Sequence, residues 1–185
     1  MAGTVQLTLS MSLDGYITGP DPSYEVPLGA GGAERLRPGG RPELAGTILA
    51  GTGATVVGRN MYDHVRGWGE DPPFKMPVFV ITHRPHPVRV AGATTFNFVD
   101  AVATAFDLAK RAAREKDVYI GGGADIADQA LRLGLVDEVN VFVEPTLLGG
   151  GTRLFDHLGG DPIDLERIGV AEYDPNTHLR FRVLR

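Results

Sequence analysis

The sequence predicts an α/β domain with a central mixed, mostly parallel sheet flanked by helices, and three observations support this prediction. Short apolar runs of strand character alternate with helical stretches between residues 52 and 143, an order typical of parallel sheets. Two strand-like segments on either side of residues 174–176 predict an antiparallel C-terminal hairpin. The 185 residues are 43% hydrophobic, which suffices for one core, so we expect a single domain spanning residues 1–185.

The N-terminal half contains both regular elements and one long loop. Alternation of apolar and polar residues from Val5 to Ser10 predicts a strand, and turn residues on both sides limit the next extended piece to Tyr16–Thr18. Residues 19–40 are rich in glycine and proline and predict a loop that covers a site, with a helical turn near 33–36. The other elements expected here are a helix at 43–50 and strands at 55–57, 78–81 and 94–98.

The second half continues the alternation and ends in strands. Asp100 is expected to cap a helix that runs to about Arg114, because apolar residues follow one face of that stretch. A strand at 118–120 leads through three glycines into a helix at 124–133, which Gly134 stops. The remaining expected elements are a strand at 139–143, a glycine-rich loop at 145–151, and hairpin strands at 165–172 and 178–184.

Composition excludes several classes of function. The absence of cysteine excludes disulfides, thiolate metal sites and a cysteine nucleophile, and makes a cytoplasmic protein the expectation. No apolar run approaches the roughly 20 residues needed to cross a bilayer. A net charge of −5 with three lysines argues against nucleic-acid binding. His83 and His86 have a metal-ligand spacing, but the adjacent prolines and the lack of a third ligand nearby argue against a metal site. The arginines are therefore considered singly, as possible anion-binding groups of a site for a small-molecule partner.

The glycine run Gly121-Gly122-Gly123 lies between a predicted strand and a predicted helix. Without Cβ atoms the backbone can approach a pyrophosphate, which the free amides of a helix N-terminus attract. The run departs from the dinucleotide fingerprint G-x-G-x-x-G because Ile126 stands in place of the third glycine. A dinucleotide site and a plain tight turn are therefore both open at this position.

Two further strand exits carry groups that bind anions. Arg59 directly follows Gly58, and its guanidinium can hold a phosphate through two hydrogen bonds, although it can also be a surface residue. Thr82, His83 and Arg84 offer a hydroxyl, an imidazole and a guanidinium, which suit the 2′-phosphate of NADP. If these strands are neighbours, the loops line one cleft that binds a phosphorylated dinucleotide.

Two carboxylates and one tryptophan have both functional and structural interpretations. Asp14 could bind an amino-substituted heterocycle or deliver a proton, or it could simply form an Asp-Gly turn. Glu144 ends an apolar strand, either as a cleft carboxylate or as a hydrogen-bonded acid. Trp68 either stacks on a ligand or packs within its loop.

Five segments together resemble the dihydrofolate reductase-like family, in the branch similar to the C-terminal reductase domain of the bifunctional riboflavin-biosynthesis deaminase/reductase. They are residues 12–17, 57–62, 80–85, 119–123 and 135–155. The resemblance covers nearly the whole chain in the same order. It implies a dihydrofolate reductase-like three-layer fold, an NADPH-dependent oxidoreductase, and pairing into a homodimer to which the antiparallel C-terminal region contributes.

The resemblance also assigns site residues. It places Arg59, Thr82, His83 and Arg84 at the adenosine-phosphate end of NADPH, and Leu9, Ser10 and Ile17 beside the nicotinamide. Asp14 is the implied catalytic residue at the substrate mouth, with Tyr16 and Glu144 as further substrate contacts. The other implied cofactor contacts are Gly58, Asn60, Met61, Gly121, Gly122, Gly123, Ala124, Asp125 and Ile126.

Departures from the family bear on the substrate. Dihydrofolate reductases carry a proton-donating acid in the stretch that corresponds to residues 29–36, where Glu34 is the candidate here. The expected reaction is hydride transfer to a small heterocycle, best represented by a 5-amino-6-ribosylaminouracil-phosphate-like pyrimidine of riboflavin biosynthesis or a related pterin. The alternatives are dihydrofolate reductase activity and a non-catalytic NADP-binding regulatory protein.

Overall fold

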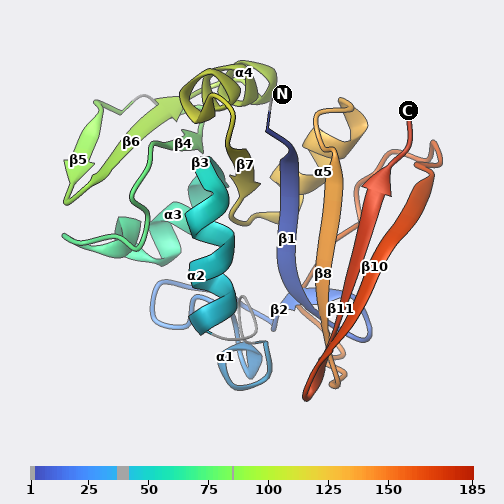
Figure 1. The fold of residues 1–185 in the computed structure, drawn as a ribbon. Coiled ribbons are helices and arrows are strands. Elements are labelled where there is room, and N and C mark those ends of the chain that lie inside the picture. Colours follow the sequence, from blue (N-terminus) through green and yellow to red (C-terminus); the bar gives the residue numbers. More distant parts are fainter. Residues whose placement is uncertain (1–2, 37–41, 85) are drawn as a thin grey trace.

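The computed structural model describes residues 3–36, 42–84 and 86–185, and a nine-stranded sheet forms its centre (Figure 1). The strands of this sheet are β1 (Val5–Ser12), β3 (Thr52–Gly58), β4 (Val78–Ile81), β5 (Arg89–Ala91), β6 (Thr94–Val99), β7 (Asp117–Ile120), β8 (Glu138–Glu144), β10 (Leu165–Tyr173) and β11 (Asn176–Val183). A separate two-stranded sheet pairs β2 (Tyr16–Thr18) with β9 (Thr152–Arg153). The helices are α1 (Gly32–Arg35), α2 (Pro42–Gly51), α3 (Arg59–His64), α4 (Val102–Ala113) and α5 (Ala124–Arg132), with a 3-10 turn, η1, at Arg66–Trp68.

The order across the large sheet is β10-β11-β8-β1-β7-β3-β4-β6-β5. The six strands from β8 to β6 are parallel to their neighbours in this block, whereas β11 and β5 run antiparallel to it. The β10–β11 hairpin closes one edge, as the sequence predicted. The predicted mixed, mostly parallel sheet with an antiparallel C-terminal hairpin is therefore confirmed.

Helices cover both faces of the sheet and divide the core in two. One cluster joins β1, β7 and β8 to α4 and α5, with Leu7, Phe106 and Ala127 fully buried. The other lies on the opposite face, where Val57 and Val80 pack against Tyr62 and the aromatic side chains around η1. The strands between these layers are apolar on both faces, as buried parallel strands must be. In Figure 1, α2 lies in front of the sheet, and α4 is seen at the top of the view.

Several local features differ from the sequence-based expectation. Helix α4 begins at Val102 with Ala101 as its N-cap and no side-chain cap, so the prediction that Asp100 caps it is wrong. Asp100 lies one residue too early for its side chain to accept from the N2 or N3 amide of this helix. The short pieces β5, β9 and η1 were not anticipated. Residues 37–40 of the predicted 19–40 loop lie outside the described residues.

The fold brings the functional segments together at one edge. Strands β3, β4, β6 and β7 are parallel, so their carboxyl ends meet at the same edge of the sheet. Helices α3 and α5 begin there, after β3 and β7, and α4 begins there after β6. Within residues 3–36, 42–84 and 86–185, none of the helices has the length and apolar character that crossing a membrane requires.

Candidate active site

Two adjoining clefts open at the carboxyl edge of the sheet. The larger, called the outer cleft, has a volume of about 560 Å³ and lies among the ends of β3 and β4 and the starts of α3, α4 and α5. The smaller, the inner cleft, has a volume of about 220 Å³ and lies among β1, β7, α3 and the loop that follows β2. Asn60, Met61 and Gly123 line both. The two clefts therefore form one continuous site of two unlike halves.

Uncapped helix N-termini meet in the outer cleft. Helices α4 and α5 start after Ala101 and Gly123, and neither start has a side-chain capping hydrogen bond. The short helix α3 starts after Gly58 in the same way. All three N-cap residues line the outer cleft. Free amides and the positive ends of helix dipoles attract anions, so this arrangement suits the phosphates of a nucleotide.

The glycine turn after β7 exposes bare backbone where the two clefts join. Gly122 and Gly123 have φ values of 135° and 96°, conformations that side chains rarely adopt. A Cβ atom on Gly122 would lie 3.5 Å from the side chain of Met61. The amide of Gly58 donates to the carbonyl of Gly122 over 3.4 Å, which ties the ends of β3 and β7 together. A phosphate group can therefore approach the chain closely here.

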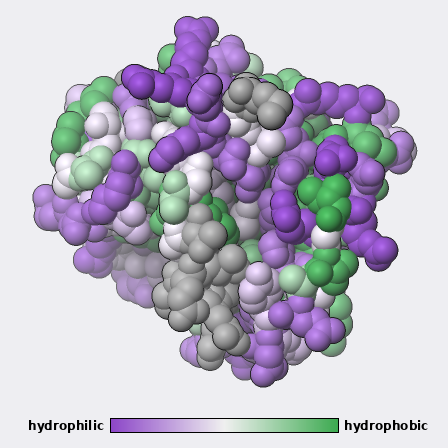
Figure 2. Space-filling model, viewed as in Figure 1, coloured by the Kyte–Doolittle hydropathy of each residue, from purple (hydrophilic) through white to green (hydrophobic). Residues whose placement is uncertain are grey.

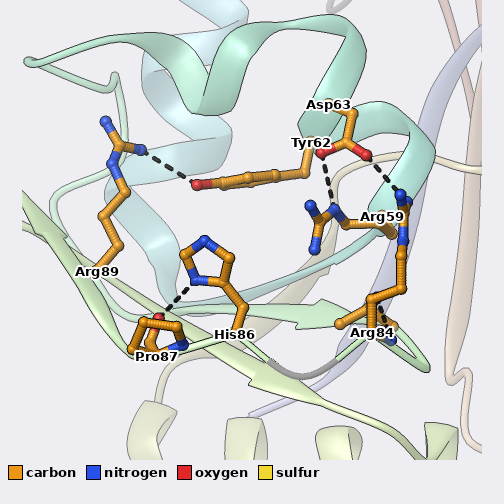
Figure 3. A network of polar contacts seen from close by, with 8 residues as sticks. Arg59, Tyr62, Asp63, Arg84, His86, Pro87 and Arg89 are labelled. Atoms are coloured by element: carbon orange, nitrogen blue, oxygen red, sulfur yellow. Dashed lines mark hydrogen bonds and ion pairs between the residues drawn. The ribbon is translucent and has the colours of Figure 1, made fainter.

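One carboxylate holds two arginines at the outer cleft (Figure 3). The Nε of Arg59 donates to Oδ1 of Asp63 over 2.7 Å, and Nη2 of Arg84 donates to Oδ2 over 3.0 Å. The side chain of Arg59 is 19% exposed and that of Arg84 is 64% exposed. The backbone amide of Arg84 also donates to Oγ1 of buried Thr82 over 3.1 Å. These contacts place two cations beside the helix N-termini.

The inner cleft is mainly apolar, with a few polar groups. Ile17, Leu28, Leu36 and Met61 form much of its wall, as is usual for sites that bind small molecules. The polar side chains of its lining are Thr8, Ser10, Thr18, Asn60, His64, Tyr119 and Thr152.

Sequence reasoning missed His64 and Tyr119, the ionisable side chains among the described residues of this wall. The hydroxyl of Tyr119 donates to the carbonyl of Thr8 over 3.3 Å, and burial raises the pKa of Tyr119 to about 12, so the phenol keeps its proton at neutral pH. A signal for both was present. His64 follows Asn60 by four residues on one helix face, and Tyr119 precedes Gly121 by two residues on a strand.

The structure brings together nearly all the residues predicted to hold the cofactor. The outer cleft is lined by Gly58, Arg59, Asn60, Met61, Thr82, His83, Arg84, Gly123, Asp125 and Ile126. The inner cleft is lined by Leu9, Ser10, Ile17, Asn60, Met61, Gly121, Gly122 and Gly123. Ala124 lines neither cleft and is buried at the first position of α5.

Asp14 lies outside both cleft linings and fastens a loop. Its carboxylate accepts from the hydroxyl of Ser12 over 2.6 Å, and from the amides of Leu148 and Gly149 over 3.1 and 2.8 Å. The Ser12 hydrogen bond, aided by these amides, lowers the pKa of Asp14 to about 2. The group is therefore deprotonated at neutral pH. Its predicted role in proton delivery stays a prediction.

The other predicted substrate contacts, Tyr16 and Glu144, and the candidate acid Glu34 also lie outside both cleft linings. The ring of Tyr16 lies 4.7 Å below the guanidinium of Arg153 on the paired strand β9. Glu144 is 3% exposed and accepts from Nδ2 of Asn176 over 3.0 Å. Glu34 is exposed, 3.8 Å from Arg35. Their roles toward a substrate stay predictions.

Trp68 and His86 line neither cleft. The Trp68 ring packs edge-on to Phe74 at 4.9 Å and parallel to Phe96 at 6.2 Å, which matches the loop-packing interpretation. The His86 ring lies against Phe98, whereas His83 lines the outer cleft. Among the residues with described positions, no three His, Asp or Glu side chains gather where they could hold a metal ion.

Comparisons with known proteins found relatives by sequence and by structure. Protein YwjB of Bacillus subtilis (strain 168) is 26% identical over 127 residues, which are 68% of this chain and 71% of YwjB. A putative riboflavin biosynthesis protein from Shewanella sp. PV-4 has a TM-score of 0.75 at 24% identity, covering 98% of this chain and 99% of that one. Dihydrofolate reductase from Enterococcus faecalis, solved with NADP(H), has a TM-score of 0.61 at 13% identity, covering 100% and 99%.

These likenesses show a dihydrofolate reductase-like fold. A family model described as the RibD C-terminal domain matches residues 3–179. Because this match spans almost the entire sequence, the chain belongs to the RibD C-terminal domain family.

Proposed function

We propose that the protein is an NADPH-dependent reductase whose outer cleft binds the adenosine and phosphate half of the cofactor. The inner cleft would then hold the nicotinamide with the substrate. The observation that carries this proposal is the meeting of uncapped helix N-termini with Arg59 and Arg84 in one cleft that opens into a smaller, apolar one. Membership of the RibD C-terminal domain family supports it, as does the fold shared with a reductase solved with NADP(H).

Each part of the site would bind a different part of the cofactor. Arg59, Arg84 and Thr82 would hold the 2′-phosphate, since guanidinium groups bind phosphate through paired hydrogen bonds. The backbone at Gly122 and Gly123 and the free amides of α5 would hold the pyrophosphate. The chain would orient both reactants along the mainly apolar inner cleft, and NADPH would supply the hydride when bound.

We further propose His64 as the group that delivers a proton to the substrate. Imidazole is the side chain most often used as a general acid, and His64 belongs to the inner cleft wall. Tyr119 fits this role poorly because burial raises its pKa to about 12. Asp14, which the sequence suggested for this role, is deprotonated at neutral pH and accepts hydrogen bonds from the amides of Leu148 and Gly149.

The proposed substrate is a small heterocycle, with an aminopyrimidine of riboflavin biosynthesis first and a pterin second. Family membership and the likeness to the Shewanella riboflavin biosynthesis protein favour the pyrimidine. Folate reduction has less support because Glu34, the candidate acid, is exposed and lines neither cleft.

The test is NADPH oxidation by the purified protein across a panel of aminopyrimidines, pterins and dihydrofolate. We expect turnover with at least one pyrimidine. We also expect Arg59→Ala to weaken NADPH binding by roughly 10- to 100-fold, the effect of losing a charged hydrogen bond of about 1.5–3 kcal/mol, with little change for NADH. Cofactor binding without turnover on any compound would favour the alternative, a non-catalytic NADP-binding protein. Equal losses of affinity for NADPH and NADH in Arg59→Ala would show that Arg59 does not bind the 2′-phosphate.

We also propose that the protein forms a homodimer through the sheet face of β8, β11 and β10. A groove of about 420 Å³ crosses this face, lined in part by Asn140, Tyr173, His178 and Arg180. Figure 2 shows apolar residues exposed on the right of the view, where Figure 1 places the C-terminal strands. Light scattering on the eluting protein should give twice the chain mass of 19.8 kDa, and a mass equal to one chain would exclude the dimer.

A further inference from the structure

We propose that Asp63 is a positioning residue that gives the site its preference for a phosphorylated dinucleotide. The proposal rests on the function proposed above, because it assumes that Arg59 and Arg84 meet the 2′-phosphate. It goes further by assigning a role to a carboxylate that does not itself attract the ligand. At first sight an acid in this place is unfavourable, since its charge repels a phosphate.

The geometry shows what the carboxylate does. Asp63 uses a separate oxygen for each arginine, 2.7 Å from Nε of Arg59 and 3.0 Å from Nη2 of Arg84. Within the described part of the chain, the terminal amino groups of Arg59 and the Nε and Nη1 of Arg84 have no hydrogen-bond partner. Asp63 thus occupies one edge of each guanidinium and leaves another edge available to a ligand, as seen in Figure 3.

The two arginines depend on Asp63 to different degrees. The guanidinium carbon of Arg59 lies 5.8 Å from the rings of both Tyr62 and Phe98, so packing also restricts this side chain. Arg84 is 64% exposed and follows β4 in an exposed turn. The bond to Asp63 is its side-chain anchor among the described residues. Without Asp63, Arg84 loses its fixed position more completely than Arg59 does.

The neighbouring Arg89 shows that a bound arginine in this region need not face the cleft. It donates to the carbonyl of Gly67 over 3.0 Å and to the hydroxyl of Tyr62 over 3.4 Å, and it lines neither cleft. Arg59 and Arg84, the two arginines that pair with Asp63, line the outer cleft instead.

Two opposing effects decide whether a substitution at Asp63 raises or lowers the affinity for NADPH. Removing the carboxylate raises the charge of the group from +1 to +2, which attracts phosphate. It also frees two long side chains that must then be ordered when the ligand binds, and arginine has high rotamer entropy. Since Asp63 is 37% exposed, solvent screens the added attraction. We expect the loss of order to dominate.

The experiment measures the Kd of NADPH and of NADH by calorimetry at fixed ionic strength, for wild type, Asp63→Ala, Asp63→Asn and Asp71→Asn. Asp71 is the matched control because it forms a similar i,i+4 pair, 3.0 Å from Lys75, on the surface outside both clefts. We expect Asp63→Ala to weaken NADPH binding about tenfold and to leave NADH binding unchanged. The affinity of Asp63→Asn for NADPH should lie between those of wild type and Asp63→Ala, because the amide keeps one acceptor oxygen but has lost the second oxygen and the charge. Asp71→Asn should match wild type.

Other outcomes overturn the proposal in distinguishable ways. If wild type prefers NADPH and both Asp63 variants keep its affinity, Asp63 has no positioning role and the proposed function stands. If the Asp63 variants lose NADPH and NADH affinity equally, Asp63 acts on the fold alone. If wild type binds neither dinucleotide, the proposed function itself fails and this inference fails with it.

Discussion

The structural role of an acidic residue near the site follows from the groups that donate hydrogen bonds to its carboxylate. Asp14 and Asp63 are both acids near the site, yet the oxygens of Asp14 accept from Ser12, Leu148 and Gly149, whereas those of Asp63 accept from two arginines. The first therefore holds a loop and the second holds cations. Residue type alone does not distinguish these two roles.

The depressed pKa of Asp14 makes the stability of the fold depend on pH. Folding lowers this pKa from 3.8 to about 2, so the unfolded chain binds the proton more readily. The stabilisation is complete above pH 3.8 and disappears as the pH falls to about 2. We predict that wild type is more stable than Asp14→Ala at pH 6 and that the difference shrinks below pH 4, as measured by urea unfolding.

An unchanged difference between the two proteins at pH 6 and pH 2.5 would contradict this account of Asp14. Turnover of a second variant, Asp14→Asn, tests the catalytic role expected from the sequence. If Asp14→Asn lowers turnover while NADPH affinity is kept, Asp14 belongs to the mechanism after all.

His64 leads to a different prediction. If it delivers the proton, His64→Gln should lower turnover by roughly 100-fold or more, the usual contribution of a general acid, while the Kd of NADPH stays the same. Steady-state rates and calorimetry measure the two quantities separately. His157→Gln is the control, because that imidazole is exposed and outside both clefts. Equal turnover of His64→Gln and wild type would remove His64 from the mechanism.

At the level of elements, the strand-to-helix turns build the site. β3 leads into α3 through Gly58, and β7 leads into α5 through Gly121–Gly123. The hydrogen bond between Gly58 and Gly122 fixes these two turns side by side. Glycine is needed at Gly122 because its φ of 135° is unfavourable for other residues.

Gly122→Ala should therefore destabilise the protein by about 1–3 kcal/mol, the usual cost of such backbone strain. Urea unfolding measures this loss. Gly46→Ala is the matched control, because Gly46 lies in α2 with open space around its position, and alanine there should stabilise the helix by up to about 1 kcal/mol. A Gly122→Ala protein as stable as wild type would show that the turn relaxes without strain.

The elements differ in how far the sequence predicts them. The alternation from Val5 onward and the apolar run Val78–Ile81 identify strands because burial imposes those patterns. The edge strand β5 has three residues, one of them arginine, and carries no such pattern. Aspartate is a common helix N-cap, but Asp100 lies one position before Ala101, the actual N-cap of α4. Only the backbone structure shows where this helix begins.

The site was predictable to a similar extent. Much of the cleft lining follows strand exits, so sequence reasoning could name Arg59, Arg84 and the glycine turn, which the structure places in the two clefts. The spacing of Arg59 and Asp63 allows an i,i+4 pair, but Arg84 joins them only because β3 and β4 are neighbours. The contact between Asp14 and Gly149 joins residues that are 135 positions apart, and no local sequence pattern predicts it.

For the whole molecule, the two clefts act as one site because a single sheet edge supports both. The cationic outer half and the apolar inner half meet at Asn60, Met61 and Gly123. Under the proposed function, the ligand that fills both would carry phosphates in the outer cleft and a weakly polar ring in the inner one. NADPH has this form.

The most direct test is a calorimetric titration of the wild-type protein with NADPH and, separately, with NADH. We expect a one-to-one complex with NADPH and at least a tenfold preference over NADH, equivalent to about 1.4 kcal/mol. We also expect a rise in melting temperature at saturating NADPH, since a ligand that binds only the folded state stabilises it. Absence of binding to both dinucleotides would contradict the account, and equal affinity for the two would contradict the role given to Arg59 and Arg84.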